Sequence, residues 1–186
     1  MAIVLQSTGG GSVSIQEPTT ASNFTQTLPA STGTVMVSGN MPAFSAKSNA
    51  LQVVTTSTTT KILFQSKNFD TNNNFASSTF TPTVAGYYQL SALVQTNYSS
   101  LKRIAVYLYK NGSAFAVLAD LDQASAVSSS FNGTGGTILV YANGSTDYFE
   151  IYGNMNGTTS ASNLGFYGDG SSILYTAFTG SLVRSA

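Results

Sequence analysis

The sequence contains no cysteine and no histidine. The absence of cysteine excludes disulfides, iron–sulfur clusters and thiolate zinc sites. The absence of histidine removes the side chain that most often shuttles protons and binds metals. Serine and threonine are abundant, but without histidine and with few lysines no base is at hand to activate a hydroxyl nucleophile. We therefore predict a protein without catalytic residues and without a cofactor.

Charged side chains are also scarce. They make up 8% of the chain, and seven basic residues balance seven acidic ones, so the net charge is zero. Lys102 and Arg103 form the only adjacent basic pair, whereas nucleic-acid binding needs several clustered cations. The N-terminus has no basic segment, and its apolar run of four residues is far too short for a signal peptide or a membrane span. These features predict no nucleic-acid partner, no membrane insertion and synthesis in a cytoplasm.

Short runs with alternating apolar residues recur in the second part of the chain. They are rich in β-branched and aromatic residues and predict strands over residues 51–54, 61–64, 86–94, 103–110, 115–118, 137–141, 148–152 and 174–183. Asn-Gly dipeptides, which close antiparallel hairpins, lie between or beside these runs at 111–112, 132–133, 143–144 and 156–157. The best helical segment, residues 118–127, is short and rich in alanine. About eight to ten strands with almost no helix predict an all-β sandwich or jelly roll.

The aromatic residues mark a boundary near residue 41. Only Phe24 precedes it, and every tyrosine follows it. The first part is rich in Thr, Ser and Gly and has too few large apolar side chains to bury a core alone. We therefore predict an extended N-terminal β arm over residues 1–41, packed on a partner or on symmetry mates, and a globular head over residues 42–186. The apolar residues of the arm that would dock are Val13, Ile15, Leu28 and Val35.

Four groups of residues in the head follow one known pattern. The first is the series Phe64, Asp70, Phe75, Phe80, Gly86 and Tyr88; the others are residues 42–46, 107–112 and 175–182. In this order they resemble the globular head of complement component q, whose fold is shared with the tumour necrosis factor superfamily. The interval from Phe75 to Phe80 is shorter than in that family, and Leu90 and Ala92 replace usual aromatics. The resemblance implies an antiparallel jelly roll and a compact homotrimer.

The last strands indicate which side chains pack together. Tyr88 and Leu90 share one face of their strand, and Phe178, Gly180 and Leu182 share one face of the last strand. A glycine inside a strand predicts close backbone approach, at an axis or at a packing seam. We expect the core or the trimer interface to contain Phe64, Phe80, Tyr88, Tyr107, Phe178, Gly180 and Leu182.

The arm resembles the short repeats near the ends of bacteriophage tail-fibre and virion proteins. The resemblance is carried by residues 12–18, 27–30 and 32–35. It implies a virion structural protein made in the host cytoplasm, docked by its arm on other capsid or tail proteins, with the head as a knob on the virion surface. A capsid decoration and a short fibre head remain open. The alternative is a receptor-binding tail-fibre tip that recognises a host surface glycan or protein.

Several carboxylates and tyrosines could bind a metal ion, catalyse glycoside hydrolysis or bind a sugar. Asp120 and Asp122 could offer oxygen ligands to calcium, as carboxylates do in some heads of this family, but calcium needs six to eight oxygens and a solvated turn explains this spacing equally well. Asp147 with Glu150, or Asp70 with Asp169, could form a catalytic carboxylate pair for glycoside hydrolysis. Nothing in the sequence places either pair at the distance that this reaction needs. We predict no metal site, and surface charges or turn caps for these carboxylates. Three tyrosines stay open as sugar-stacking residues: Tyr98, Tyr152 and Tyr167.

Overall fold

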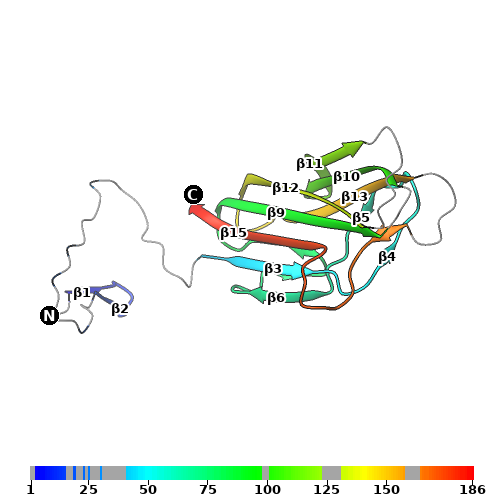
Figure 1. Cartoon of the computed structure of the whole chain (residues 1–186). Helices are drawn as coiled ribbons and strands as arrows, with labels where there is room; N and C mark the ends of the chain where they lie inside the picture. Colours follow the sequence, from blue (N-terminus) through cyan, green and yellow to red (C-terminus); the bar gives the residue numbers. More distant parts are fainter. Residues whose placement is uncertain are drawn as a thin grey trace. The chain divides into compact units, whose positions relative to one another are not determined.

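The computed structural model describes residues 3–15, 41–97, 101–122, 131–157 and 164–186, together with Thr19, Asn23, Thr25 and Ala30. The chain divides into two units, residues 1–33 and 34–186, whose relative positions are not determined. The described part is built from strands and contains no helix (Figure 1). It accordingly has no helix that is long and apolar enough to span a membrane.

The first unit contains one β-hairpin. Strand β1 (Ile3–Gln6) pairs with β2 (Ser12–Ile15) in antiparallel register. The turn is closed by the N–H of Ser7, which donates to the carbonyl of Gly11 over 2.8 Å. Gly10 has a φ of +85°, a conformation that favours glycine.

The second unit, the head, is a sandwich of two antiparallel sheets (Figure 1). The seven-stranded sheet runs β4 (Gln52–Val53), β14 (Gly165–Phe166), β9 (Gly86–Asn97), β15 (Ala177–Ser185), β3 (Ala43–Lys47) and β6 (Ser66–Asp70), with β12 (Phe131–Ala142) paired to β9. The six-stranded sheet runs β11 (Ser113–Asp122), β10 (Leu101–Lys110), β13 (Phe149–Gly157), β8 (Thr79–Phe80) and β7 (Phe75–Ala76), with β5 (Thr60–Lys61) paired to β13. The prediction of an all-β antiparallel sandwich is confirmed.

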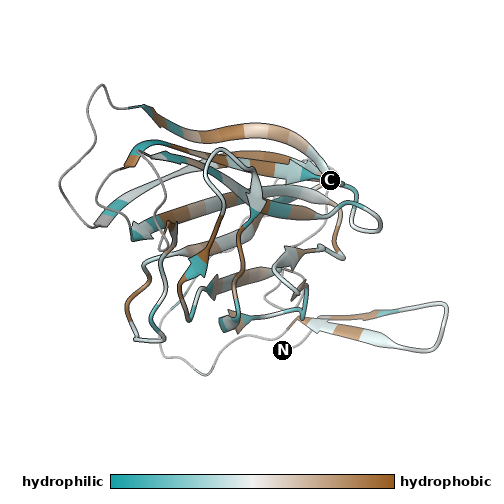
Figure 2. Ribbon diagram, turned by 90° about the vertical axis from the view of Figure 1, so that its right-hand side faces the viewer, coloured by the Kyte–Doolittle hydropathy of each residue, from teal (hydrophilic) through white to brown (hydrophobic). Residues whose placement is uncertain are grey.

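The core lies between the two sheets and is dominated by phenylalanine. Phe44 of β3 stacks on Phe80 and Phe75 from the other sheet, with ring centroids 4.3 and 5.0 Å away, and meets Phe178 edge to face at 5.0 Å. Tyr88 is also fully buried. Its hydroxyl donates to the carbonyl of Val84 over 2.7 Å, and burial raises the pKa of this hydroxyl to about 12. Brown stretches along the long strands in Figure 2 show that both sheets contribute apolar residues.

Two of the four Asn-Gly dipeptides form turns. Asn111 and Gly112 join β10 to β11 with φ values of 54° and 79°. Asn143 lies between β12 and β13, and its Oδ1 accepts the backbone N–H groups of Ser145 and Thr146, each over 2.9 Å. An amide side chain that binds its own turn in this way is the reason why Asn is favoured there.

The other two Asn-Gly turns were predicted wrongly. Residues 132–133 lie inside β12, where Asn132 pairs with Thr96 and Gly133 with Gln95. Residues 156–157 close strand β13, where Asn156 pairs with Arg103 of β10. In both cases continuous pairing with a neighbouring strand overrides the local turn preference. The segment over 118–127 is not helical as far as Asp122, where β11 ends, and its remainder lies outside the described residues.

Candidate association surface

The outer face of the seven-stranded sheet, which points away from the core, carries a row of apolar and aromatic side chains. Register places Tyr87 of β9 opposite Tyr141 of β12, and Leu93 of β9 opposite Gly135. Leu93 is 45% exposed and Leu139 of β12 is 58% exposed. Because side chains alternate along a strand, these residues project opposite to the buried Tyr88 and Leu90 of β9 and to the buried Val140 of β12. The outward face of β9 and β12 thus combines exposed leucine and tyrosine with uncharged polar side chains, among them Gln89, Ser91 and Thr137.

One end of the outer face is aromatic. The rings of Tyr87 and Tyr141 lie 5.6 Å apart, and the guanidinium of Arg184 lies 5.3 Å from the centroid of Tyr87. Stacking of Arg184 on this ring is a cation–π contact. Arg184 thus covers the aromatic end with its planar group and keeps its charge at the border of the apolar surface.

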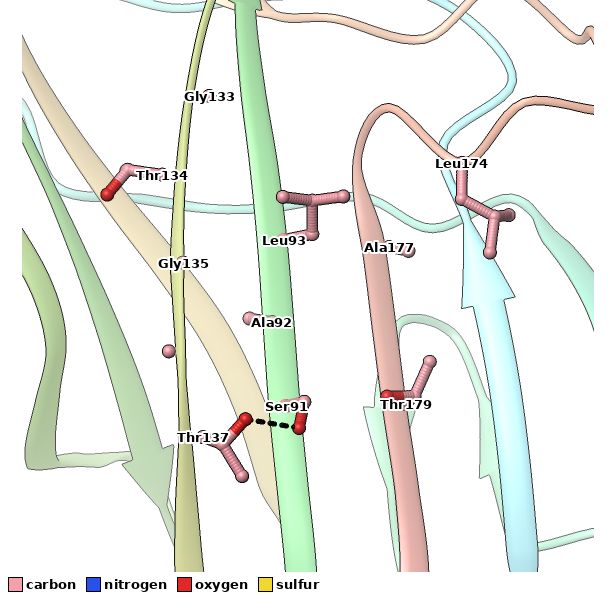
Figure 3. A pocket seen from close by; sticks show the side chains of 11 residues that line it. Ser91, Ala92, Leu93, Gly133, Thr134, Gly135, Thr137, Leu174, Ala177 and Thr179 are labelled. Atoms are coloured by element: carbon pink, nitrogen blue, oxygen red, sulfur yellow. Dashed lines mark hydrogen bonds between the residues drawn. The ribbon is translucent and has the colours of Figure 1, made fainter.

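The middle of the outer face holds a shallow groove of about 540 Å³. Figure 3 shows Leu93 between the backbone of β12 on one side and Ala177 on the other, with Leu174 beyond. Gly133 and Gly135 carry no side chain and so leave space along β12. Nearby, the hydroxyls of Ser91 and Thr137 are joined by a hydrogen bond of 2.7 Å. None of the described residues that line the groove is charged.

The glycines of β12 are required by the packing of the backbone. A Cβ atom at Gly135 would collide with the carbonyl oxygen of Ala92 on β9, and one at Gly136 would collide with the carbonyl oxygen of Leu118 on β11. At Gly133 an added Cβ would meet only the flexible end of Gln95, at 2.9 Å. Gly136 therefore allows the edges of the two sheets to approach closely, while Gly135 allows β12 to lie against β9.

Most of the predicted core or interface residues lie inside the single head. Phe64, Phe80, Tyr88, Phe178 and Leu182 are buried between the sheets. Gly180 also faces inward, where an added Cβ would lie 2.5 Å from Leu90 and 2.6 Å from Phe44. Their side chains stabilise the head and leave no surface for a partner.

Tyr107 has a different position. It is half-buried on the outward side of β10 in the six-stranded sheet, opposite Tyr152 in register. Tyr152 stacks on Tyr109, with ring centroids 3.9 Å apart, so its ring faces a neighbour in a strand and not a loop. Tyr167 meets the ring of Tyr175 edge to face at 5.0 Å. Tyr98 lies outside the described residues.

The predicted docking residues of the arm are only partly described. Val13 and Ile15 belong to β2 and are 65% and 55% exposed. Leu28 and Val35 lie outside the described residues.

The candidate calcium ligands form no cluster. Asp120 accepts two hydrogen bonds from Arg103, of 2.8 and 2.6 Å, and these bonds hold the pKa of Asp120 below its ordinary value. Asp122 is exposed at the end of β11. Among the described residues no three carboxylate, cysteine or histidine side chains lie together in a way that would hold a metal ion.

The carboxylates considered for glycoside hydrolysis each belong to a separate set of contacts. Asp147 binds Lys110 over 2.9 Å and Asn111 over 2.8 Å. Burial alone would raise its pKa, but hydrogen bonds from Asn111, Lys110 and the backbone of Asn143 hold the pKa of Asp147 below its ordinary value. Glu150 binds Lys61 over 2.7 Å and Thr79 over 3.0 Å.

The second pair is also divided between two turns. Asp70 accepts the N–H groups of Asn74 and Phe75 over 2.9 and 3.0 Å, whereas Asp169 accepts that of Ser171 over 2.9 Å. These contacts assign turn-capping roles to both carboxylates.

Comparison with known proteins identifies the fold. No family model and no curated protein sequence matches the chain. Among solved structures, the globular domain of zebrafish complement 1qA protein superimposes with a TM-score of 0.54 and 19% identity, over 78% of this chain and 99% of that one. Murine APRIL, in a structure at pH 8.5, superimposes with a TM-score of 0.51 and 10% identity, over 77% of this chain and 99% of that one. The head therefore has the jelly-roll fold of complement component q and of the tumour necrosis factor-like proteins.

Proposed function

We propose that the head associates with two further copies of itself through the outer face of the seven-stranded sheet, and that the homotrimer is a non-enzymatic structural knob on the surface of a bacteriophage virion. The association of three heads is supported by the exposed leucines and tyrosines of this outer face, which lie beside a groove without charged side chains. Monomeric soluble proteins rarely leave a large contiguous apolar surface in water. Each Å² of apolar surface that association removes from water contributes about 25 cal/mol.

The chemistry of the outer face favours a second copy of the same chain as the partner. Along β9 and β12 it exposes leucines and tyrosines together with uncharged polar side chains such as Gln89 and Thr137. Surfaces with few charges are typical of the centre of homo-oligomer interfaces. Arg184, at the border, already stacks on Tyr87 of its own chain. The sequence resemblance to heads that form trimers supports three copies arranged around one axis.

The mass of the protein in solution tests this association. Light scattering after size-exclusion chromatography should give three times the chain mass of 19.4 kDa. Leu139→Arg should weaken association at least about 100-fold, because it places an unpaired charge in a desolvated contact. Leu63→Arg is the matched control, since Leu63 is also exposed but lies in the connection between β5 and β6. A wild-type chain that is monomeric and folded at all concentrations would overturn the trimer.

The virion role rests on the arm, whose sequence resembles the repeats of phage fibre and virion proteins. An arm with a single charged side chain, Glu17, and without catalytic groups suits docking on other virion proteins. The remaining choice is between a capsid decoration or short fibre head and a receptor-binding tip that recognises a host glycan or protein. Both have the same fold and differ in their position on the particle.

Electron cryomicroscopy of the particle that encodes this chain tests the role. We expect density with threefold symmetry that fits three heads. Such density on the capsid lattice would establish a decoration, and density at the tail would favour receptor binding. A particle that lacks the chain altogether would refute the virion role without affecting the trimer.

A further inference from the structure

The hairpin of the first unit has one strongly apolar face. Leu5 of β1 lies directly opposite Val13 of β2, and Ile15 projects to the same side as Val13 because it follows by two residues. Their exposed fractions are 57%, 65% and 55%. The opposite face carries Ser14 and its partner Val4, which is 53% exposed. Most of the exposed apolar side chains of the hairpin thus lie on one side, and more than half of the surface of each is exposed.

A hairpin of this size cannot hold such a face in water by itself. Two short strands are at best marginally stable alone, and independent stability needs three or more strands with a shared apolar face. The connecting turn contains Gly9, Gly10 and Gly11, which increase the entropy lost on folding. The hairpin therefore requires a packing partner that buries its apolar face.

The near absence of charged side chains in this segment limits the kind of partner that can pack on the apolar face. Residues 1–40 contain a single charged side chain, Glu17, and the hairpin itself contains none. A nucleic acid or an anionic membrane surface would be attracted by basic residues, which are absent from this segment. An uncharged apolar face is complementary to an identical face, since neither side brings repulsion or an unpaired charge.

Association of the heads supplies that identical face. Each hairpin is joined to a head by its own chain, so three associated heads hold three hairpins at a high effective concentration. Two strands from each copy together provide the number that a stable apolar core of strands needs.

We infer that the hairpins of three chains pack their apolar faces against one another around a common axis, with Leu5, Val13 and Ile15 inside and Ser14 outside. The inference rests on the proposed homotrimer. It assigns β1 and β2 to contacts between copies and leaves the rest of the arm for other virion proteins.

The absence of cysteine from the sequence allows a clean test with the full-length chain. Val13→Cys introduces one thiol on the apolar face, and Ser14→Cys introduces one on the opposite face as the matched control. Both proteins are treated with a short bismaleimide reagent at low protein concentration and separated under denaturing conditions. Val13→Cys should give a covalent dimer in a yield at least about tenfold higher than Ser14→Cys, because packing raises the effective concentration only on the inner face.

The two proposals fail in different ways. A trimeric mass with equal cross-linking of the two variants would overturn the packing of the hairpins and leave the head trimer intact. A monomeric mass with no cross-linking would overturn the trimer and, with it, this inference. Cross-linking of Val13→Cys that persists when Leu139→Arg weakens the heads would show that the hairpins associate on their own, which supports the inference more strongly.

Discussion

Replacing Phe44 with alanine is expected to lower the free energy of unfolding by about 3–5 kcal/mol, the usual cost of removing a buried aromatic ring. Phe44 is 1% exposed and touches three other phenylalanines. Two of them, Phe75 and Phe80, belong to the opposite sheet, so the ring of Phe44 joins the two layers. Its loss would leave a cavity between β3 and the β7–β8 hairpin that a close-packed core cannot refill.

Urea-induced unfolding followed by circular dichroism measures this effect. Phe69→Ala is the control, because Phe69 lies in the neighbouring strand β6 but is 52% exposed, and its loss should cost less than about 1 kcal/mol. Both variants are compared with the wild type at one protein concentration, since association stabilises the folded state by mass action. Equal losses for Phe44→Ala and Phe69→Ala would show that the phenylalanine cluster is not the main core.

The inward faces of the two central strands could be predicted from the sequence. The alternation from Gly86 onward placed Tyr88 and Leu90 on one face, and register now sets them opposite Leu182 and Gly180 of β15. The reason is that a period of two is preserved along both strands, so the spacing alone defines which side chains share a face.

Among the residues expected in the core or the trimer interface, Tyr107 differs from the others because it lies outside the core of the single head. In β10 both phases contain apolar residues, and the charged residues Lys102, Arg103 and Lys110 are divided between the two phases, so they do not mark the outward side. The structure buries Val106 and Leu108 and leaves Tyr107 half-buried on the outward face. Only the pairing of β10 with β13, far away in the sequence, decides between the two phases.

The outer face of the seven-stranded sheet could not be predicted for a similar reason. Leu93 lies close to Val94 in an apolar run, and Leu139 lies beside Val140, so neither stands out as a surface residue. The groove depends on Gly133 and Gly135, which the sequence analysis interpreted partly as a turn. Its formation requires the register that sets Gly135 beside Leu93, a contact between residues about forty positions apart.

Substitution of Gly180 should lower the free energy of unfolding of the head, whereas replacing a strand glycine with alanine usually raises it. Glycine in a strand normally costs about 0.5–1 kcal/mol relative to alanine, so Gly→Ala usually stabilises. At Gly180 an added Cβ would lie 2.5 Å from Cδ2 of Leu90 and 2.6 Å from Cε1 of Phe44. Both neighbours are fully enclosed in the core and have no space to move away. We expect a loss of about 1–2 kcal/mol for Gly180→Ala and about 3 kcal/mol for Gly180→Val.

A double-mutant cycle with Leu90 tests whether this collision is the cause. Leu90→Val removes the Cδ2 atom that the new side chain would meet first. In the Leu90→Val background, Gly180→Ala should therefore lower the free energy of unfolding, measured in urea, by about 1 kcal/mol less than in the wild type. If the two positions were independent, their effects on this free energy would add. Stabilisation by Gly180→Ala in the wild-type background would mean that the strands separate there without penalty. Since Gly180 pairs with both Phe44 and Leu90, such a result would also contradict the close packing of β15 between β3 and β9 on which the whole seven-stranded sheet depends.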